Sequence, residues 1–158
     1  MIPRGSLPDR VTKTVLSVDQ KARIDVELAK NWIRALRDPK RKQARSLLQR
    51  KRPDGKKGQC CLGVACEIDG MVTAPFDSKI DQYQGRKPVG AEVFVATDND
   101  KERYTTMPPM ELRYRLGISD ITNIFAQLND GNRMPFGKIA DLYENFLIKN
   151  KVLDGPVE

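Results

Sequence analysis

The stretch that most constrains the fold is residues 59–68, QCCLGVACEI, an apolar run that contains all three cysteines of the chain. Leu62, Ala65 and Cys66 recur at helical spacing and share one face, while the other apolar residues face a second layer. We therefore expect a short buried helix at the centre of the core, in which Gly63 permits a neighbouring element to approach closely. A buried strand is the alternative, because short apolar runs fit both structures.

The cysteines are weak candidates for chemistry. A nucleophilic thiol needs a basic or cationic neighbour, and the chain contains no histidine, which excludes cysteine–histidine dyads and serine–histidine–aspartate triads. Three thiols, two of them adjacent, do not supply the paired ligands of a structural zinc site. A thiolate activated by a helix N-terminus and nearby lysines, and a zinc site completed by carboxylates, are the alternatives. We interpret Cys60, Cys61 and Cys66 as core residues and predict no catalytic residue, metal or cofactor.

Charge is concentrated in one segment. Residues 30–57 contain twelve Lys or Arg and two Asp, a net charge of +10, whereas the 158-residue chain carries +7 and the remainder therefore −3. Such asymmetry indicates either a surface that binds polyanions or a solvated basic face. No aromatic residue follows Trp32 in this segment to stack on bases. The candidate residues for binding a polyanion or another partner are Lys40, Arg41, Lys42, Arg45, Arg50, Lys51 and Arg52.

Two helices are predicted in the first third of the chain. Ser17 and Gln20 form a capping-box pattern that opens a helix extending to about Arg37, where Asp38-Pro39 ends it. A second, very basic helix is expected over residues 40–50, with the apolar side chains pointing inward. The turn residues Pro53, Asp54 and Gly55 then lead into the cysteine run.

The rest of the pattern predicts an α+β fold, a mainly helical single domain with one β-hairpin. Residues 92–106 have the alternation and central turn of that hairpin, and three helical patterns follow it, the last beginning at Pro135. We expect a disordered or tag-derived N-terminus over 1–16, one globular domain over 17–150 and a C-terminal tail over 151–158. The predicted core comprises Trp32, Cys60, Cys61, Leu62, Cys66, Phe136, Ile139 and Tyr143.

Four motifs occur in order along the chain: KNWIRALRDPKRKQARSLLQ, GQCCLGVACEIDG, MPPMELRYRLGI and LNDGNRMPFGKIADLYENFL. Together they resemble a family of small uncharacterised bacteriophage and prophage proteins with a C-C-L-G-V-x-C block and a closing L-N-D…F-x-x-I-A-D helix. The resemblance covers roughly residues 28–148. The sequence departs from the pattern in three places: Pro135 stands where the family usually has serine, DLYENF where D-x-I-E is expected, and Asp38-Pro39 near the usual glycine. The resemblance implies a phage or prophage origin and an intracellular site of action, and it implies no activity.

Three functional hypotheses follow. The first is a small phage-encoded, non-enzymatic binding protein in the host cytoplasm that acts on a host protein or a host signalling molecule, in an accessory or counter-defence role. The alternative is a nucleic-acid-binding protein that uses the basic segment 30–57 and a C-terminal helical hairpin, residues 119–146, with helix-turn-helix proportions. The third is an enzyme that uses carboxylates or thiols. No stretch approaches the roughly 20 apolar residues of a membrane span, so no membrane partner is expected; the oligomeric state stays open.

Overall fold

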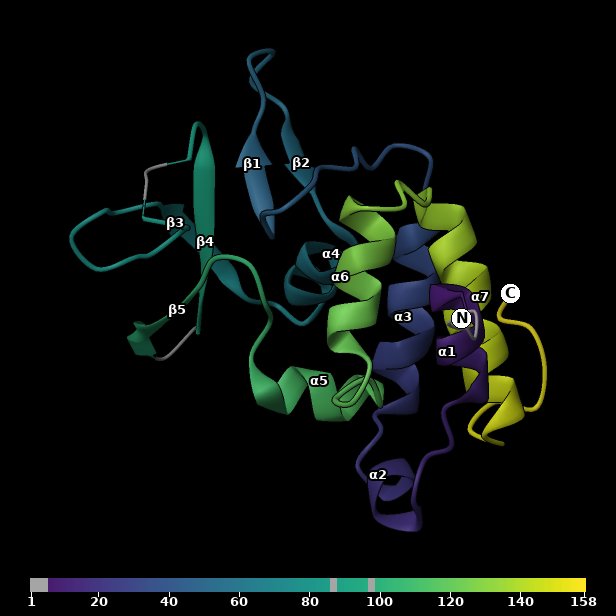
Figure 1. The fold of residues 1–158 in the computed structure, drawn as a ribbon. Coiled ribbons are helices and arrows are strands. Elements are labelled where there is room, and N and C mark those ends of the chain that lie inside the picture. Colours follow the sequence, from purple (N-terminus) through teal and green to yellow (C-terminus); the bar gives the residue numbers. More distant parts are fainter. Residues whose placement is uncertain (1–5, 86–87, 97–98) are drawn as a thin grey trace, which may run out of the picture.

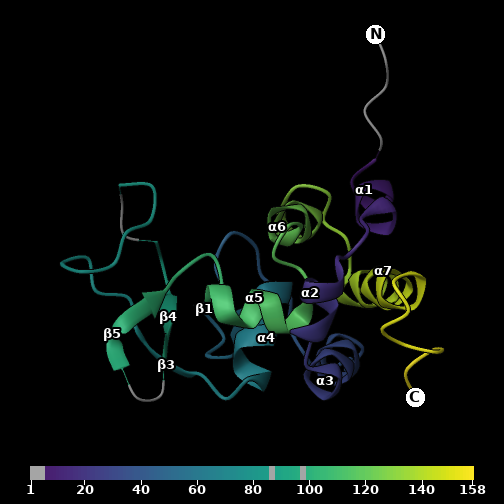
Figure 2. The same ribbon diagram turned by 90° about the horizontal axis from the view of Figure 1, so that it is seen from below.

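The computed structural model describes residues 6–85, 88–96 and 99–158. The helices are α1 (Leu7–Lys13), α2 (Val18–Ala22), α3 (Val26–Leu36), α4 (Cys61–Ile68), α5 (Met110–Leu116), α6 (Thr122–Asp130) and α7 (Phe136–Lys149). The strands are β1 (Gln49–Lys51), β2 (Lys57–Gln59), β3 (Val72–Pro75), β4 (Ala91–Ala96) and β5 (Asn99–Tyr104). The helices form a body on one side and the sheet lies on the other, with α4 between them (Figures 1 and 2). The predicted α+β class is confirmed.

The helical body is built around Trp32 of α3. Its indole Nε1–H donates a hydrogen bond to the carbonyl oxygen of Cys61 at 2.9 Å. Its ring meets the rings of Phe125 and Tyr143 edge-on, with centroid separations of 5.7 and 4.6 Å. The Tyr143 hydroxyl in turn donates to the Leu116 carbonyl at 2.6 Å. All eight residues predicted for the core are buried, so the cysteine run is a central packing element, as the sequence indicates.

The sheet is antiparallel and larger than the hairpin that the sequence predicts. Strands β4 and β5 form that hairpin, with Phe94 opposite Tyr104, and Asp98 of its predicted turn lies outside the described residues. The full order is β2-β1-β4-β3, with β5 also paired to β4. Since β3 occupies one edge of β4, β1 and β5 share the other, β1 at the start of β4 and β5 near its end.

Strand β4 is covered on both faces, which explains its apolar sequence. Phe94 points into the main core of the helical body. Val93 and Val95 point the other way, into a second cluster that includes Phe76 and Tyr83. The segment that follows β3 therefore covers the outer face of the sheet with Phe76 and Tyr83.

The predicted helix over residues 40–50 is wrong. This segment is extended: Gln43 forms a parallel bridge to Gln59, and β1 pairs with both β2 and β4. Ser46 has φ of 69°, in the left-handed region that a right-handed helix does not contain. Leu47 and Leu48 are buried as predicted, but on opposite sides, in the second cluster and the main core respectively.

Gly63 explains why the extended segment fits against α4. A Cβ atom at this position would overlap the carbonyl oxygen of Leu48. Only glycine therefore lets the backbone before β1 pass directly over the α4 helix. The predicted close approach at Gly63 is confirmed, although the neighbour is an extended segment and not a helix.

The predicted N-terminal helix is also divided in two. The capping box of Ser17 and Gln20 is present, but α2 ends after one turn. Asp25 then begins α3 by accepting a hydrogen bond from the Leu28 amide at 3.1 Å, while its own amide donates to the Arg115 carbonyl. A tertiary contact with α5 therefore interrupts the helix that periodicity alone would continue.

Both ends of the described chain pack on the helical body. The N-terminus, predicted as disordered or tag-derived over 1–16, contains the helix α1, which is capped by Ser6 and buries Val11 against the main core. At the other end Leu153 is buried, and the Val157 amide donates to a Glu144 carboxylate oxygen at 2.8 Å. In the described part of the chain, none of the helices is both long enough and apolar enough to span a bilayer.

Candidate functional site

Three of the quoted motifs meet at one buried side chain, Asn129 of α6. Its amide oxygen accepts hydrogen bonds from the Cys61 amide at 3.1 Å and from Gln43 Nε2 at 2.8 Å. Its amide nitrogen donates to the Ala44 carbonyl at 2.8 Å and to Asp130 at 2.9 Å. Because each polar atom of Asn129 is used in holding α4, α6 and the extended segment together, these motif residues are structural.

The three thiols are buried and their pKa values are raised. Cys60, Cys61 and Cys66 are free and buried. Burial raises the pKa of Cys60 to about 12 and raises the pKa of Cys61 and Cys66 well above the usual thiol value. A cysteine nucleophile needs the opposite shift. Within the described residues, no group of three or more Cys, Asp or Glu side chains is placed to hold a metal ion.

The basic residues gather on a surface beside the sheet. We call residues 40–42 together with the β1–β2 hairpin, residues 49–59, the basic surface. The Gln59 amide donates to the Lys42 carbonyl at 2.9 Å, which fixes the loop beside β2. Strands β1 and β2 and their turn project from the body (Figure 1). The sequence predicts a helix for the cations of residues 40–50 and a turn after it, whereas the fold presents them on a two-stranded ribbon and the adjoining loop.

A cleft of about 490 Å³ separates the loop from the hairpin. Glu67 of α4 forms part of its wall and binds Arg41 at 3.0 Å and Lys57 at 2.8 Å. Burial opposes ionisation of Glu67, but the hydrogen bonds from Lys57, Gln59 and Arg41 outweigh it, so its pKa lies below the usual value. One carboxylate therefore anchors two cations, and the cleft keeps a net positive charge from Lys40, Lys42 and Lys56, which also line it.

The seven predicted binding residues differ in exposure, in ion pairing and in their position relative to the cleft. Lys40, Lys42 and Lys51 are exposed, and Arg52 forms a long ion pair with Asp54 at 3.7 Å. Arg41 and Arg50 are half-buried, and each has a buried Nε atom without a hydrogen-bond partner among the described residues. Arg45 is exposed on the stretch that α6 holds, outside the cleft lining. Lys56 and Lys57 also line the cleft but are absent from the predicted set. In the sequence, only their charge marks them as binding candidates.

The predicted C-terminal helical hairpin corresponds to α6 and α7. Helix α7 packs along α1 and α3 (Figure 2), and its first buried residues face the main core. Of its outer residues, Asp141 is bound by Arg37 at 2.9 Å, and Glu144 is covered by Arg37 and the C-terminal segment. Arg37 offsets part of the charge of these carboxylates. Through these contacts the α6–α7 pair is part of the scaffold, while Lys138 and Asn145 are exposed on α7.

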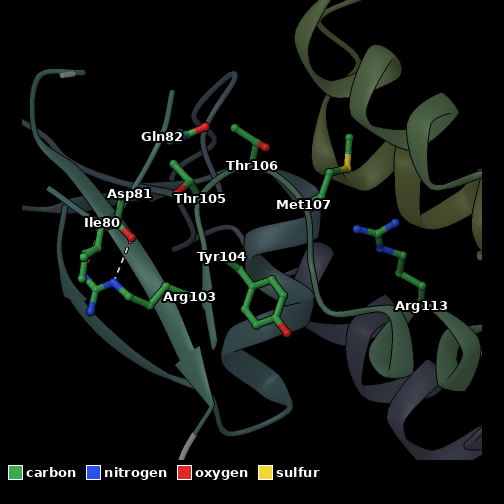
Figure 3. Close-up of a pocket in the computed structure, with 9 residues that line it drawn as sticks. All are labelled: Ile80, Asp81, Gln82, Arg103, Tyr104, Thr105, Thr106, Met107 and Arg113. Atoms are coloured by element: carbon green, nitrogen blue, oxygen red, sulfur yellow. Dashed lines mark hydrogen bonds and ion pairs between the residues drawn. The ribbon is translucent and has the colours of Figure 1, made fainter. Parts of the chain in front are cut away.

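A second cavity lies where the sheet meets the helical body. This junction pocket has a volume of about 740 Å³ and is formed by the loop after β3, the end of β5 with the segment following it, and α5 (Figure 3). Its charged lining residues are Asp81, Arg103 and Arg113. No sequence pattern marks it, because the contributing residues are single polar side chains from distant segments.

No known protein family, curated protein or solved structure shows a significant match to this chain. The resemblance to phage proteins therefore stays a prediction from the motifs, and the functional argument depends on the geometry of the two candidate sites.

Proposed function

We propose that this chain is a nucleic-acid-binding protein that contacts the phosphates of a duplex through the basic surface. The observation that carries the proposal is the presence of four exposed lysines there, Lys40, Lys42, Lys51 and Lys56, that form no ion pair with any described residue. Cations without acidic partners are free to replace the counterions that surround a nucleic acid, and that replacement supplies most non-specific affinity.

The shape and composition of the surface favour a duplex over a single strand. A two-stranded ribbon of this kind fits the major groove of DNA. Residues 40–57 contain no aromatic side chain, and stacking on aromatic rings supplies much of the affinity of proteins that bind single strands. Binding through phosphates alone positions a protein without reading sequence, so we expect weak sequence preference.

A host protein or signalling molecule as the partner, the first hypothesis from the sequence, has less support on this surface. Trp32, the natural aromatic anchor for an interface, is fully buried in the core. We retain as proposals, on the motif resemblance alone, a bacteriophage origin, a non-enzymatic role and action in the host cytoplasm.

Fluorescence anisotropy with a 20-base-pair duplex at several salt concentrations tests the proposal. We expect micromolar affinity near 0.1 M salt, at the tight end of non-specific binding. Replacing Lys40, Lys42, Lys51 and Lys56 by Gln removes four candidate contacts, which lowers the slope of log affinity against log salt by about 3–4.

The matched control replaces Lys13, Lys138, Lys149 and Lys151 by Gln. These lysines are exposed on the helical body and also form no ion pair with a described residue, so the net charge changes equally. We expect the control to keep most of the parent affinity and slope. An equal loss in both variants, or no measurable binding by the parent at physiological salt, contradicts the proposal. Co-purification with a defined host protein in place of nucleic acid would favour the first hypothesis.

A further inference from the structure

The junction pocket is separate from the basic surface and differs from it in chemistry. The two cavities share no lining residue. Its volume of about 740 Å³ lies in the range of pockets that hold small molecules. Figure 3 shows Asp81 and Arg103 on the sheet side of the pocket and Arg113 on the α5 side.

On the sheet side the charges cancel. Arg103 binds Asp81 through two parallel hydrogen bonds, Nε to Oδ1 at 2.8 Å and Nη2 to Oδ2 at 2.9 Å. The Asp77 amide donates to the same carboxylate at 2.8 Å. The hydrogen bonds from Arg103 hold the pKa of Asp81 below its usual value, so the pair is ionised and neutral overall. It forms a rigid polar wall without a free negative charge.

On the opposite side Arg113 supplies an uncompensated positive charge. Its Nε–H donates to the Pro108 carbonyl at 2.8 Å, which fixes the plane of the half-buried guanidinium. Among the described residues its Nη atoms have no hydrogen-bond or ion-pair partner, and Figure 3 shows them directed away from α5, toward the pocket lining at Met107. A held guanidinium with free N–H groups matches the oxygens of a phosphate group.

The remaining lining residues divide the pocket into a polar and an apolar part. Thr105 and Thr106 follow β5 and carry hydroxyl groups that form no hydrogen bond with the described residues. Gln82 adds a side-chain amide, and Ile80, Tyr104 and Met107 contribute apolar surface. Beside the neutral ion pair, the lining therefore combines one fixed cation, two hydroxyls, one amide and an apolar wall that includes an aromatic ring.

We propose that the junction pocket binds a small phosphorylated molecule with a flat ring system. The phosphate binds the Nη atoms of Arg113 and the Thr106 hydroxyl, and the ring lies against Tyr104 and Met107. A mononucleotide has this chemistry and a size that the pocket can hold. The proposal does not depend on nucleic-acid binding at the basic surface.

The test is a titration of the amide NMR spectrum with AMP, and separately with adenosine and inorganic phosphate. We expect AMP to shift the amides of residues 103–107 and 113 with millimolar or tighter affinity, and adenosine to bind at least tenfold more weakly because it lacks the phosphate. Inorganic phosphate should shift residues near Arg113 only, which distinguishes a phosphorylated ring compound from the free anion. No shift at 10 mM AMP, or equal binding of AMP and adenosine, overturns the proposal.

Arg113→Gln should weaken AMP binding at least tenfold, and Arg113→Lys, which keeps the charge but loses the planar donor pair, should weaken it less. Arg10→Gln, on the exposed face of α1, is the matched control and should leave binding unchanged. The four-lysine variant of the basic surface should bind AMP like the parent. Equal binding by Arg113→Gln and parent, with both folded, contradicts the assignment.

Discussion

The helical body and the sheet side of this protein are held together in different ways. The body has one continuous apolar core, in which the rings of Trp32, Phe125 and Tyr143 contact one another. The sheet has short strands, β1 and β2 being three residues each, and a second cluster of six buried residues among those that the structure describes. Both candidate ligand sites involve the sheet side. The difference indicates that the body supplies most of the stability and that the sheet carries the binding surfaces, the usual division between scaffold and functional segments.

Helix α4 connects the two regions. Cys61 at its start contacts Trp32 and Asn129 in the body, while Glu67 near its end binds Arg41 and Lys57 of the basic surface. Helix α4 therefore helps to fix the basic surface to the core, together with the pairing of β1 with β4. Substitutions in the helical body should affect the basic surface by unfolding the protein. Substitutions on the basic surface should leave the helical body folded.

The largest expected effect is from Trp32→Ala in the body. The change removes a fully buried ring, its edge-on contacts with two other rings and its hydrogen bond to Cys61. We expect the free energy of unfolding to fall by about 3–5 kcal/mol, measured by urea denaturation. Val93→Ala, in the second cluster, is the comparison on the sheet side and should cost about 1–2 kcal/mol. Equal losses of unfolding free energy in the two variants would contradict the inference that the body supplies most of the stability.

Asn129→Ala should have the next largest effect. It leaves the Cys61 amide, the Gln43 side chain and the Ala44 carbonyl without the partners that Asn129 provides. Unsatisfied buried groups cost about 1–3 kcal/mol each, and some relaxation is expected, so we predict a loss of about 3 kcal/mol in thermal or urea unfolding. A loss below about 1 kcal/mol would show that the motif residues do not hold the segments together.

Acid should weaken the sheet side through Asp81. Its pKa is depressed by Arg103, so the carboxylate stabilises the fold above the unfolded value near 3.8, and that contribution is lost as the pH falls through the depressed folded value. Asp81→Asn should remove about 2 kcal/mol near neutral pH and flatten the stability profile below pH 4. Urea midpoints between pH 7 and pH 2.5 measure this. If the urea midpoint of Asp81→Asn falls with pH in parallel with that of the parent, Asp81 is not the group whose protonation weakens the fold.

The sequence predicts the body better than the sheet for a physical reason. Residues 60–66 are apolar throughout, and helical periodicity in α3 and α7 is local information. By contrast, Gln49-Arg50-Lys51 has no apolar alternation and becomes a strand because it pairs with Glu92 and Gln59. The adjacent Leu47 and Leu48 suit a helix as well as an extended segment, and the extended form goes with tertiary contacts, the pairing of β1 and the close approach at Gly63.

The two candidate binding sites, like the sheet, are only partly predictable from the sequence. The net charge of residues 30–57 locates the basic surface in the sequence, but the cleft depends on the pairing of residues 42 and 59, which a charge count does not contain. The junction pocket joins residues 80–82, 103–107 and 113 through sheet pairing and the placement of α5. Single polar residues at such separations leave no pattern to recognise.

The central claim is that the helical body is the scaffold and that the sheet side carries the binding surface. Mapping duplex binding on the folded protein tests this claim most directly. In an amide NMR titration with a 20-base-pair duplex at about 50 mM salt, the largest shifts should fall in residues 40–42 and 49–59. Helices α3 and α7 should keep their spectrum, and the four-lysine variant should show the parent spectrum without the duplex-induced shifts. Shifts centred on α6 and α7, or no shifts at any ratio of duplex to protein, would contradict the account.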